Sequence, residues 1–246
     1  MGRRGAVVLV LLLGLAPVAA NPAAAQSAGW GRTSGGCQVW DPWGGGEALA
    51  WSGGCAGGPG GGKASGKGQL RRGTGRTSLV FEGTLREGKA QGEGRIGWPD
   101  GSLYTGSWRD GQRSGQGEQV FANGNRYEGA WRAEVPHGRG TLTTSTGLRY
   151  EGDWKDGQRT GQGVFSMRDG TRYTGGFLNG RQEGQGTQVF ANGSRYEGAW
   201  RNGLPNGPGV GYGAVTGRVF RGIFVNGCLR TAEFVAAFGV ADTACR

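Results

Sequence analysis

Few residues of this 246-residue chain have the types and spacing that catalysis requires. His137 is the only histidine, and it occupies a variable repeat position just before a Gly-x-Gly pair, so we interpret it as solvent-facing. Because no Ser or Cys nucleophile is placed by any motif, a catalytic triad is excluded, and one histidine excludes a histidine-based zinc site. The sequence therefore predicts a protein that is not an enzyme and holds no metal or cofactor.

Two weaker chemical signals have structural interpretations. Residues 57–64 (GGPGGGKA) nearly match a phosphate-binding loop, but Ala64 stands where Ser or Thr must bind magnesium. We interpret this segment as a flexible glycine-rich stretch. Glutamates recur beside aromatic residues, at Glu82, Glu128, Glu151 and Glu197. A ladder of equivalent carboxylates lacks the unlike environments that an acid and a base require, so glycoside hydrolysis is not expected.

Arginines recur at two repeat positions and are the candidate anion-binding or lipid-binding residues. Arg126, Arg149, Arg172 and Arg195 share one position, and the other holds Arg86, Arg109, Arg132, Lys155 and Arg201. Stacked in register about 10 Å apart, such columns suit bidentate contacts to phosphate or carboxylate. The structural alternative is that each arginine packs its stem on a ring and pairs with a nearby carboxylate. Both interpretations stay open.

The ends of the chain carry targeting and cross-linking signals. Arg3 and Arg4, the apolar run 6–20 and the small residues after it predict a cleaved signal peptide over 1–25, too short for a spanning helix. The protein is therefore expected in the periplasm or outside the cell.

Four cysteines in an exported chain predict disulfides. Of three pairings we favour Cys37–Cys55 and Cys228–Cys245, because each closes a short loop at one end, worth about 3 kcal/mol.

Composition limits the fold to short strands and tight turns. The chain has 57 glycines, 9 Trp, 6 Tyr and 9 Phe, which together disfavour helical folds and disordered polar chain. The net charge is +10, but residues 81–246 hold twenty basic and sixteen acidic residues. This modest excess, together with export, argues against nucleic acid as a partner.

A 23-residue repeat defines the architecture. An aromatic residue, a glycine two positions later and a large apolar residue after two more recur along the chain, followed by a Gly-x-Gly pair. The signature residues are Tyr104, Gly106, Trp108, Tyr127, Gly129, Trp131, Tyr150, Gly152, Trp154, Tyr173, Gly175, Phe177, Tyr196, Gly198 and Trp200. In a strand the three signature positions face one side, and Asn-Gly or Asp-Gly pairs favour hairpin turns with positive φ. Each repeat is therefore expected to be one hairpin of an elongated, all-β, single antiparallel sheet.

The frame resembles the MORN repeat, with consensus Y-x-G-x-W-x-x-G-x-x-x-G-x-G. Residues 150–157 (YEGDWKDG), with Gly161 and Gly163, match it at every key position. The resemblance covers 81–228, as six repeats and the start of a seventh. The third repeat has Ala133-Glu134 in place of the turn glycine, so we expect a distorted hairpin there.

The rest of the chain flanks this array. Residues 26–80 form a glycine-rich segment with a degenerate repeat that begins at Trp51 and a capping disulfide, and 229–246 form a C-terminal cap. Residues 26–36 and 56–70 are expected to be poorly ordered.

Similarity to MORN proteins implies protein-binding or membrane-associated roles without naming the ligand. The leading hypothesis is a non-enzymatic exported scaffold that binds a protein at the cell envelope. The alternative is direct binding of anionic phospholipid or envelope polymer through the arginine columns.

Overall fold

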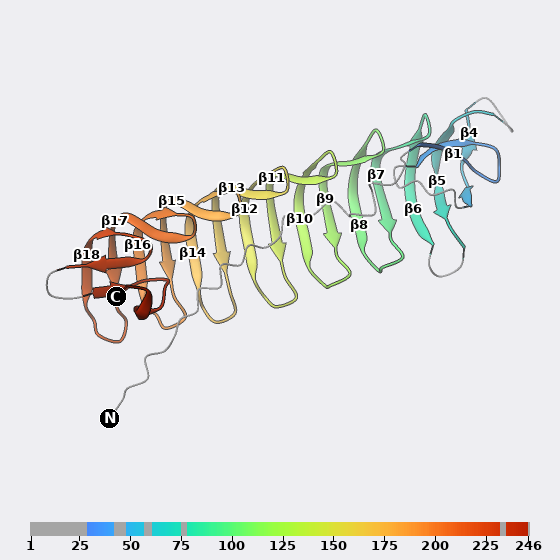
Figure 1. Ribbon diagram of the computed structural model, residues 1–246. Helices are drawn as coiled ribbons and strands as arrows, with labels where there is room; N and C mark the ends of the chain where they lie inside the picture. Colours follow the sequence, from blue (N-terminus) through green and yellow to red (C-terminus); the bar gives the residue numbers. More distant parts are fainter. Residues whose placement is uncertain (1–28, 42–47, 57–60, 75–77, 232–234, 246) are drawn as a thin grey trace. The chain divides into compact units, whose positions relative to one another are not determined.

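The protein is all-β, in agreement with the sequence. The computed structural model describes residues 29–41, 48–56, 61–74, 78–231 and 235–245. It contains one long antiparallel sheet of hairpins that does not close on itself (Figure 1). The predicted signal peptide, 1–25, lies outside the described residues. Among the residues that are described, no helix is long and apolar enough to cross a membrane.

The chain divides into two compact units, one over 18–145 with 155–157 and the other over 146–154 with 158–246. Strands of the N-terminal unit are β1 (Gly29–Arg32), β2 (Gln38–Asp41), β3 (Leu49–Trp51), β4 (Gly54–Cys55), β5 (Ala64–Arg72), β6 (Leu79–Arg86), β7 (Lys89–Gly97), β8 (Leu103–Arg109), β9 (Gln112–Val120), β10 (Arg126–Arg132) and β11 (Val135–Thr143). The C-terminal unit holds β12 (Arg149–Lys155), β13 (Gln158–Ser166), β14 (Arg172–Leu178), β15 (Arg181–Val189), β16 (Arg195–Arg201), β17 (Leu204–Tyr212), β18 (Val219–Phe224), β19 (Cys228–Arg230), β20 (Val235–Ala237) and the 3-10 helix η3 (Asp242–Cys245).

The tight turn of each hairpin uses two residues with positive φ, as the Asn-Gly and Asp-Gly pairs predict. Asp110 and Gly111 have φ of 51° and 82°. The sequence predicts a distorted hairpin in the third repeat, and this is wrong. Ala133 and Glu134 adopt φ of 45° and 74°, the same turn conformation without a glycine. The left-handed conformation is costly for residues with a Cβ, so contacts elsewhere must stabilise this turn.

A bulge at the Gly-x-Gly pair interrupts these hairpins. In the β8–β9 hairpin, Gly106 faces Gly117 and Trp108 faces Arg113, so Ser107 lies opposite three residues of β9. One of the three, Gly115, has a φ of 90°, which glycine adopts at no steric cost. The same register shift recurs in β10–β11, β14–β15 and β16–β17.

The repeat tyrosine covers the glycine that follows the bulge. A Cβ at Gly117 would lie 2.4 Å from the Tyr104 hydroxyl oxygen and 2.6 Å from its ring carbons. That hydroxyl donates a hydrogen bond of 3.0 Å to the carbonyl of Ser107, the residue that the bulge leaves without a register partner in β9. Four other hydroxyls make the equivalent bond, those of Tyr127, Tyr150, Tyr173 and Tyr196. The signature therefore encodes a ring that fits only over glycine.

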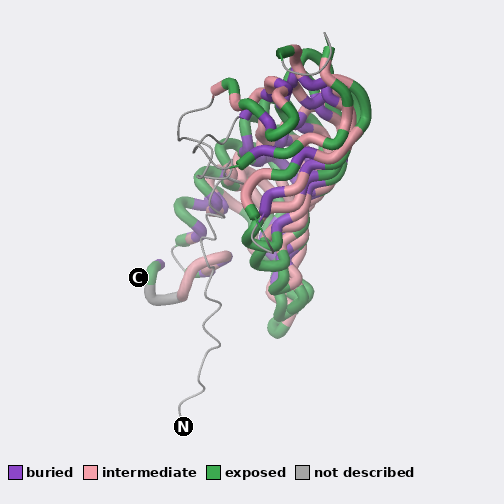
Figure 2. The backbone as a smooth tube through the Cα atoms, turned by 90° about the vertical axis from the view of Figure 1, so that its right-hand side faces the viewer, coloured by how far each residue is buried: buried purple, intermediate pink, exposed green. Residues whose placement is uncertain are grey.

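The second aromatic of each repeat links it to the repeat before. Trp108 packs edge-to-face on Tyr104 at 5.4 Å and on Phe81 of the preceding repeat at 5.3 Å. In the C-terminal unit Phe177 does the same with Tyr173 at 5.2 Å and Tyr150 at 5.0 Å. Each such pair contributes about 0.5–1.5 kcal/mol beyond area burial. Within each unit the buried positions of neighbouring strands line up (Figure 2).

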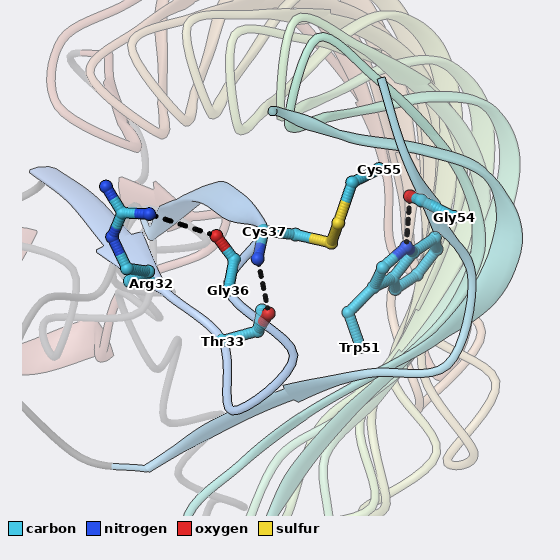
Figure 3. Close-up of a disulfide and its surroundings, with 7 residues drawn as sticks. All are labelled: Arg32, Thr33, Gly36, Cys37, Trp51, Gly54 and Cys55. Atoms are coloured by element: carbon cyan, nitrogen blue, oxygen red, sulfur yellow. Dashed lines mark hydrogen bonds between the residues drawn. A yellow bond between two sulfur atoms is a disulfide. The ribbon is translucent and has the colours of Figure 1, made fainter. Parts of the chain in front are cut away.

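Disulfides join the end segments, in the pairing that the sequence favours. Cys37 is bonded to Cys55, with Cα atoms 5.6 Å apart, and Cys228 to Cys245, with Cα atoms 5.5 Å apart. Figure 3 shows the first of these beside Trp51, whose indole nitrogen donates to the Gly54 carbonyl.

Parts of the segments expected to be poorly ordered are strands. Residues 29–32 form β1 and 64–72 form β5, which pairs with β6. Within the phosphate-loop-like segment, the described residues 61–64 lead into β5 rather than into a helix. The expectation therefore overlooked backbone pairing as a source of order in glycine-rich chain.

The fit of ring over glycine is testable by one added methyl group. We expect Gly117→Ala to lower the free energy of unfolding by about 1–3 kcal/mol, because the Cβ overlaps Tyr104. Gly97→Ala is the matched control, since a Cβ there meets nothing within 4 Å. Urea unfolding followed by circular dichroism measures both. Equal stability of the two variants would contradict this account of the repeat.

Alkaline pH tests the burial of the tyrosines. Burial raises the pKa of Tyr196 from 10.0 to about 12, and raises the pKa values of Tyr104, Tyr150 and Tyr173. Since the folded values exceed the unfolded ones, this contribution to stability is complete below pH 10 and is lost as pH rises through about 12. We expect tyrosinate absorbance near 295 nm to rise together with loss of the β-sheet signal. Ionisation of most of the six tyrosines near pH 10 in a folded chain, as in urea-unfolded protein, would refute it.

Candidate functional site

The predicted arginine columns lie on the outer face of the sheet, defined here as the face opposite the repeat tyrosines. Arg126 donates through Nε to Glu118 at 2.5 Å and pairs with Glu128 at 3.0 Å. Arg149 pairs with Glu151 at 2.6 Å, and Arg195 pairs with Glu197. These contacts follow the structural alternative of local ion pairing.

The remaining candidates divide between paired and unpaired. Arg132 bonds to Asp156 at 2.8 Å. Arg172 and Arg109 are exposed and contact no carboxylate among the described residues. The Arg126–Glu118 hydrogen bond lowers the pKa of Glu118. Arg126, Arg132, Arg149 and Arg195 are therefore neutralised by local ion pairs, and anion binding by the columns stays a prediction.

Two other arginines lie on the inner face, the face that carries the tyrosines. Arg113 and Arg159 are only 5% and 6% exposed. They occupy the repeat position that precedes the Gly-x-Gly pair by two residues. At the equivalent position Ala90, Pro136 and Pro205 are buried and uncharged, and Gln182 is half-buried and uncharged.

Arg113 is neutralised by a carboxylate from the turn of the next repeat. Its Nε donates to Glu134 Oε2 at 2.8 Å, its Nη2 to the Glu134 carbonyl at 3.0 Å and its Nη1 to Gln119 at 2.8 Å. Glu134 Oε1 also accepts from the Arg113 backbone amide at 2.6 Å. The guanidinium stacks 4.5 Å from the centre of the Trp131 ring. These contacts stabilise the left-handed turn at Glu134.

Arg159 has no such partner. Its Nη2 donates to the Gly180 carbonyl at 2.5 Å, and its guanidinium lies 5.5 Å from the Tyr150 ring centre and 5.6 Å from that of Phe177. No carboxylate among the described residues contacts it. Burial lowers the pKa of Arg159, although an arginine remains charged at neutral pH.

Apolar side chains are exposed on the outer face of β17 and β18, at Val210, Tyr212, Val219 and Ile223, which we call the C-terminal patch. Register pairs Tyr212 with Val219, and Ile223 is 63% exposed. Within the described chain, β18 pairs with β17 alone in the long sheet. Exposed apolar side chains gathered on one face, here around Arg221, mark interaction sites.

Comparison with known families decides the class. The MORN repeat model matches residues 81–103, 104–126, 127–149, 150–172, 173–195 and 196–210, more than half of the chain. The chain belongs to the MORN-repeat family. This family is a non-enzymatic repeat scaffold type whose members commonly mediate protein or membrane binding.

Similarity to individual proteins is weak. No curated protein matches the chain at a significant level. Among solved structures, the chain is similar to the TCP domain of SAS-4 (dCPAP) of Drosophila melanogaster, solved with a proline-rich motif of Ana2 (dSTIL). The identity is 14%, over 54% of this chain and 72% of that one, with a TM-score of 0.36.

Single residues of the MORN array that the sequence singled out are placed as follows. His137 is half-buried rather than solvent-facing, with Nδ1 3.8 Å from Asp156 and no hydrogen-bond partner for that atom among the described residues. Glu82 accepts from Gln69 on the outer face. In the part of the chain that is described, no group of three or more His, Cys, Asp or Glu is placed to hold a metal.

Sequence reasoning missed Arg113, Arg159 and Glu134. Aligned MORN repeats do carry the signal, because two arginines occupy a position that is Ala or Pro in three other repeats. The sequence alone shows Ala133-Glu134 only as a departure from the turn pattern. The role of Glu134 depends on its contact with Arg113 of the preceding repeat, which the pattern within one repeat does not predict.

Removing the Glu134 charge tests the buried pair. We expect Glu134→Gln to lower the free energy of unfolding by about 3–5 kcal/mol, because Arg113 is left buried and charged without an acid. Glu118→Gln breaks the exposed pair with Arg126 and should cost about 1 kcal/mol or less. Denaturant unfolding of both variants at neutral pH gives the comparison. A similar cost for the two would show that burial does not distinguish the pairs.

Proposed function

We propose that the chain is a non-enzymatic, exported MORN scaffold that binds a protein at the cell envelope. The C-terminal patch is the observation that carries the proposal. Exposed apolar residues on the last two strands of a sheet suit burial against another protein.

Export has separate support. Two disulfides are consistent with an oxidising compartment, since such bonds are rare where thiols are kept reduced. The predicted signal peptide at 1–25 agrees with this location. The protein partner is therefore expected in the periplasm or outside the cell.

Lipid or polymer binding through the arginine columns is the second candidate. Arg172 and Arg109 favour it, because both are exposed and contact no carboxylate among the described residues. The ion pairs of Arg126, Arg149 and Arg195 count against it, since an anion must compete with carboxylates already in place.

A photo-crosslinking experiment tests protein binding at the patch. A photoreactive residue replaces Arg221, which lies in register with Val210, in cells that express the full chain. We expect one discrete protein adduct, lost with Ile223→Lys and kept with Val215→Lys. Val215 is the control because it is 89% exposed and lies outside the patch. An adduct that survives Ile223→Lys, or no adduct at all, would refute the proposal. A cross-link to a second copy would instead identify self-association.

Vesicle co-sedimentation tests the alternative. With the purified chain and anionic or neutral vesicles, we expect no pelleting at physiological salt, because Arg126, Arg149 and Arg195 already pair with carboxylates and salt screens the other column charges. Pelleting with anionic vesicles that persists at this salt would favour lipid binding instead. It should then be abolished by charge reversal at Arg126, Arg149, Arg172 and Arg195.

A further inference from the structure

The starting observation is a buried charge that lacks a counter-ion. Arg159 is 6% exposed, and the one hydrogen bond that its guanidinium makes within the described residues runs from Nη2 to a backbone carbonyl. The rings of Tyr150 and Phe177 flank the guanidinium. A desolvated cation is expensive to keep unless an acid or an aromatic face compensates it, and rings alone supply a small part of that compensation.

A second copy of the same position shows what completes this environment. Arg113 lies two repeats earlier and has the same burial, but Glu134 supplies a carboxylate to its Nε. Glu134 and Gly180 occupy equivalent turn positions. The amide of each bonds to the carbonyl of its arginine, at 3.2 Å for Glu134 and 2.9 Å for Gly180. Their φ values are 74° and 80°.

Because Gly180 stands where the earlier repeat has Glu134, this turn has no carboxylate, and the space of the glutamate side chain is left open. A Cβ built there meets only Arg159 Nη2 within 4 Å, at 3.8 Å, and Gly180 itself is half-buried rather than enclosed. A carboxylate approaching from the turn can reach the guanidinium where the Glu134 side chain reaches Arg113.

We infer that Arg159 is a receptor for a carboxylate supplied from outside the chain, namely an Asp or Glu side chain of a protein partner. This goes beyond the proposed function, because Arg159 lies on the inner face and not in the C-terminal patch, and it rests on that proposal only for the identity of the donor as a protein. The acid side chain takes the place that Glu134 takes beside Arg113. A charge-assisted hydrogen bond from Nε to one carboxylate oxygen, as at Arg113, is stronger than a neutral one, and the flanking rings suit apolar residues on either side of the acid.

Nuclear magnetic resonance of the arginine side chains tests the site directly. The probe is a capped Leu-Glu-Leu peptide at millimolar concentration, added to the full chain labelled with ¹⁵N-arginine. We expect Leu-Glu-Leu to cause a saturable shift of the Arg159 Nε–Hε signal. The affinity derived from this shift should be at least tenfold weaker for Leu-Gln-Leu. The Arg113 signal should not move, because Glu134 already occupies its carboxylate position. Equal shifts with both peptides, or none at Arg159, would overturn the inference. A shift with inorganic phosphate alone would overturn the carboxylate assignment.

Two variants provide independent checks. Arg159→Gln places at this position the residue that Gln182 already provides in the next repeat, and should abolish the peptide effect. Gly180→Glu installs an internal carboxylate and should block the peptide from Arg159. The melting temperature should respond more favourably to Gly180→Glu in the wild-type background than in Arg159→Gln. Equal responses would show that the two positions do not couple.

The peptide assay and the crosslinking assay test the two proposals independently. An adduct at Arg221 that Arg159→Gln leaves unchanged in yield, together with no peptide shift, refutes the carboxylate receptor while the scaffold proposal stands. Absence of the adduct with a specific Leu-Glu-Leu shift refutes protein binding at the C-terminal patch while the receptor stands.

Discussion

The contact between a tyrosine ring and a glycine governs the whole array. Tyr104 fills the space beside Gly117, and its hydroxyl bonds to the carbonyl of Ser107, which the bulge leaves without a register partner. The bulge in turn needs a glycine with positive φ at Gly115. Ring, bulge and glycines are therefore one device, and a register slip of one residue would place every ring on the wrong face. This interdependence explains why a quarter-glycine chain can fold around a specific core.

The packing of tyrosine on glycine constrains the residue types on the inner face of the sheet but not those on the outer face. The inner face is occupied by rings, glycines and one position whose carbonyl accepts from the turn of the next repeat, as Gly157 donates to Pro136. The outer face has no comparable constraint, so charged pairs such as Arg149 with Glu151 and the apolar C-terminal patch coexist there. On the inner face, Arg113 is compensated by four hydrogen bonds to Glu134 and Gln119, whereas Arg159 has no carboxylate partner among the described residues.

Periodicity alone predicts the hairpins, their antiparallel order and the inward face of Tyr, Gly and Trp, because these depend on spacing within one repeat. The disulfides also follow from spacing. The outer ion pairs depend on cross-strand register, which places Glu118 beside Arg126 and which the repeat length does not specify. The third turn was misjudged for a related reason. Turn propensity describes isolated hairpins, whereas Glu134 is held by a residue of the preceding repeat.

Repetition also offers a simple route to a binding site. An array that already holds an internal arginine–carboxylate pair can expose the same chemistry by omitting the acid from a neighbouring copy. Arg113 with Glu134 and Arg159 with Gly180 differ in this acid, and Arg113 bonds to Gln119 as well. The omission leaves the turn intact, because glycine is better suited than glutamate to a φ near 80°. Glycine therefore relieves the backbone strain of this turn. It also leaves the buried cation unpaired, which costs free energy, and an external acid would lower that cost. The free energy of binding at such a position would come from pairing a buried arginine that the fold leaves without a carboxylate.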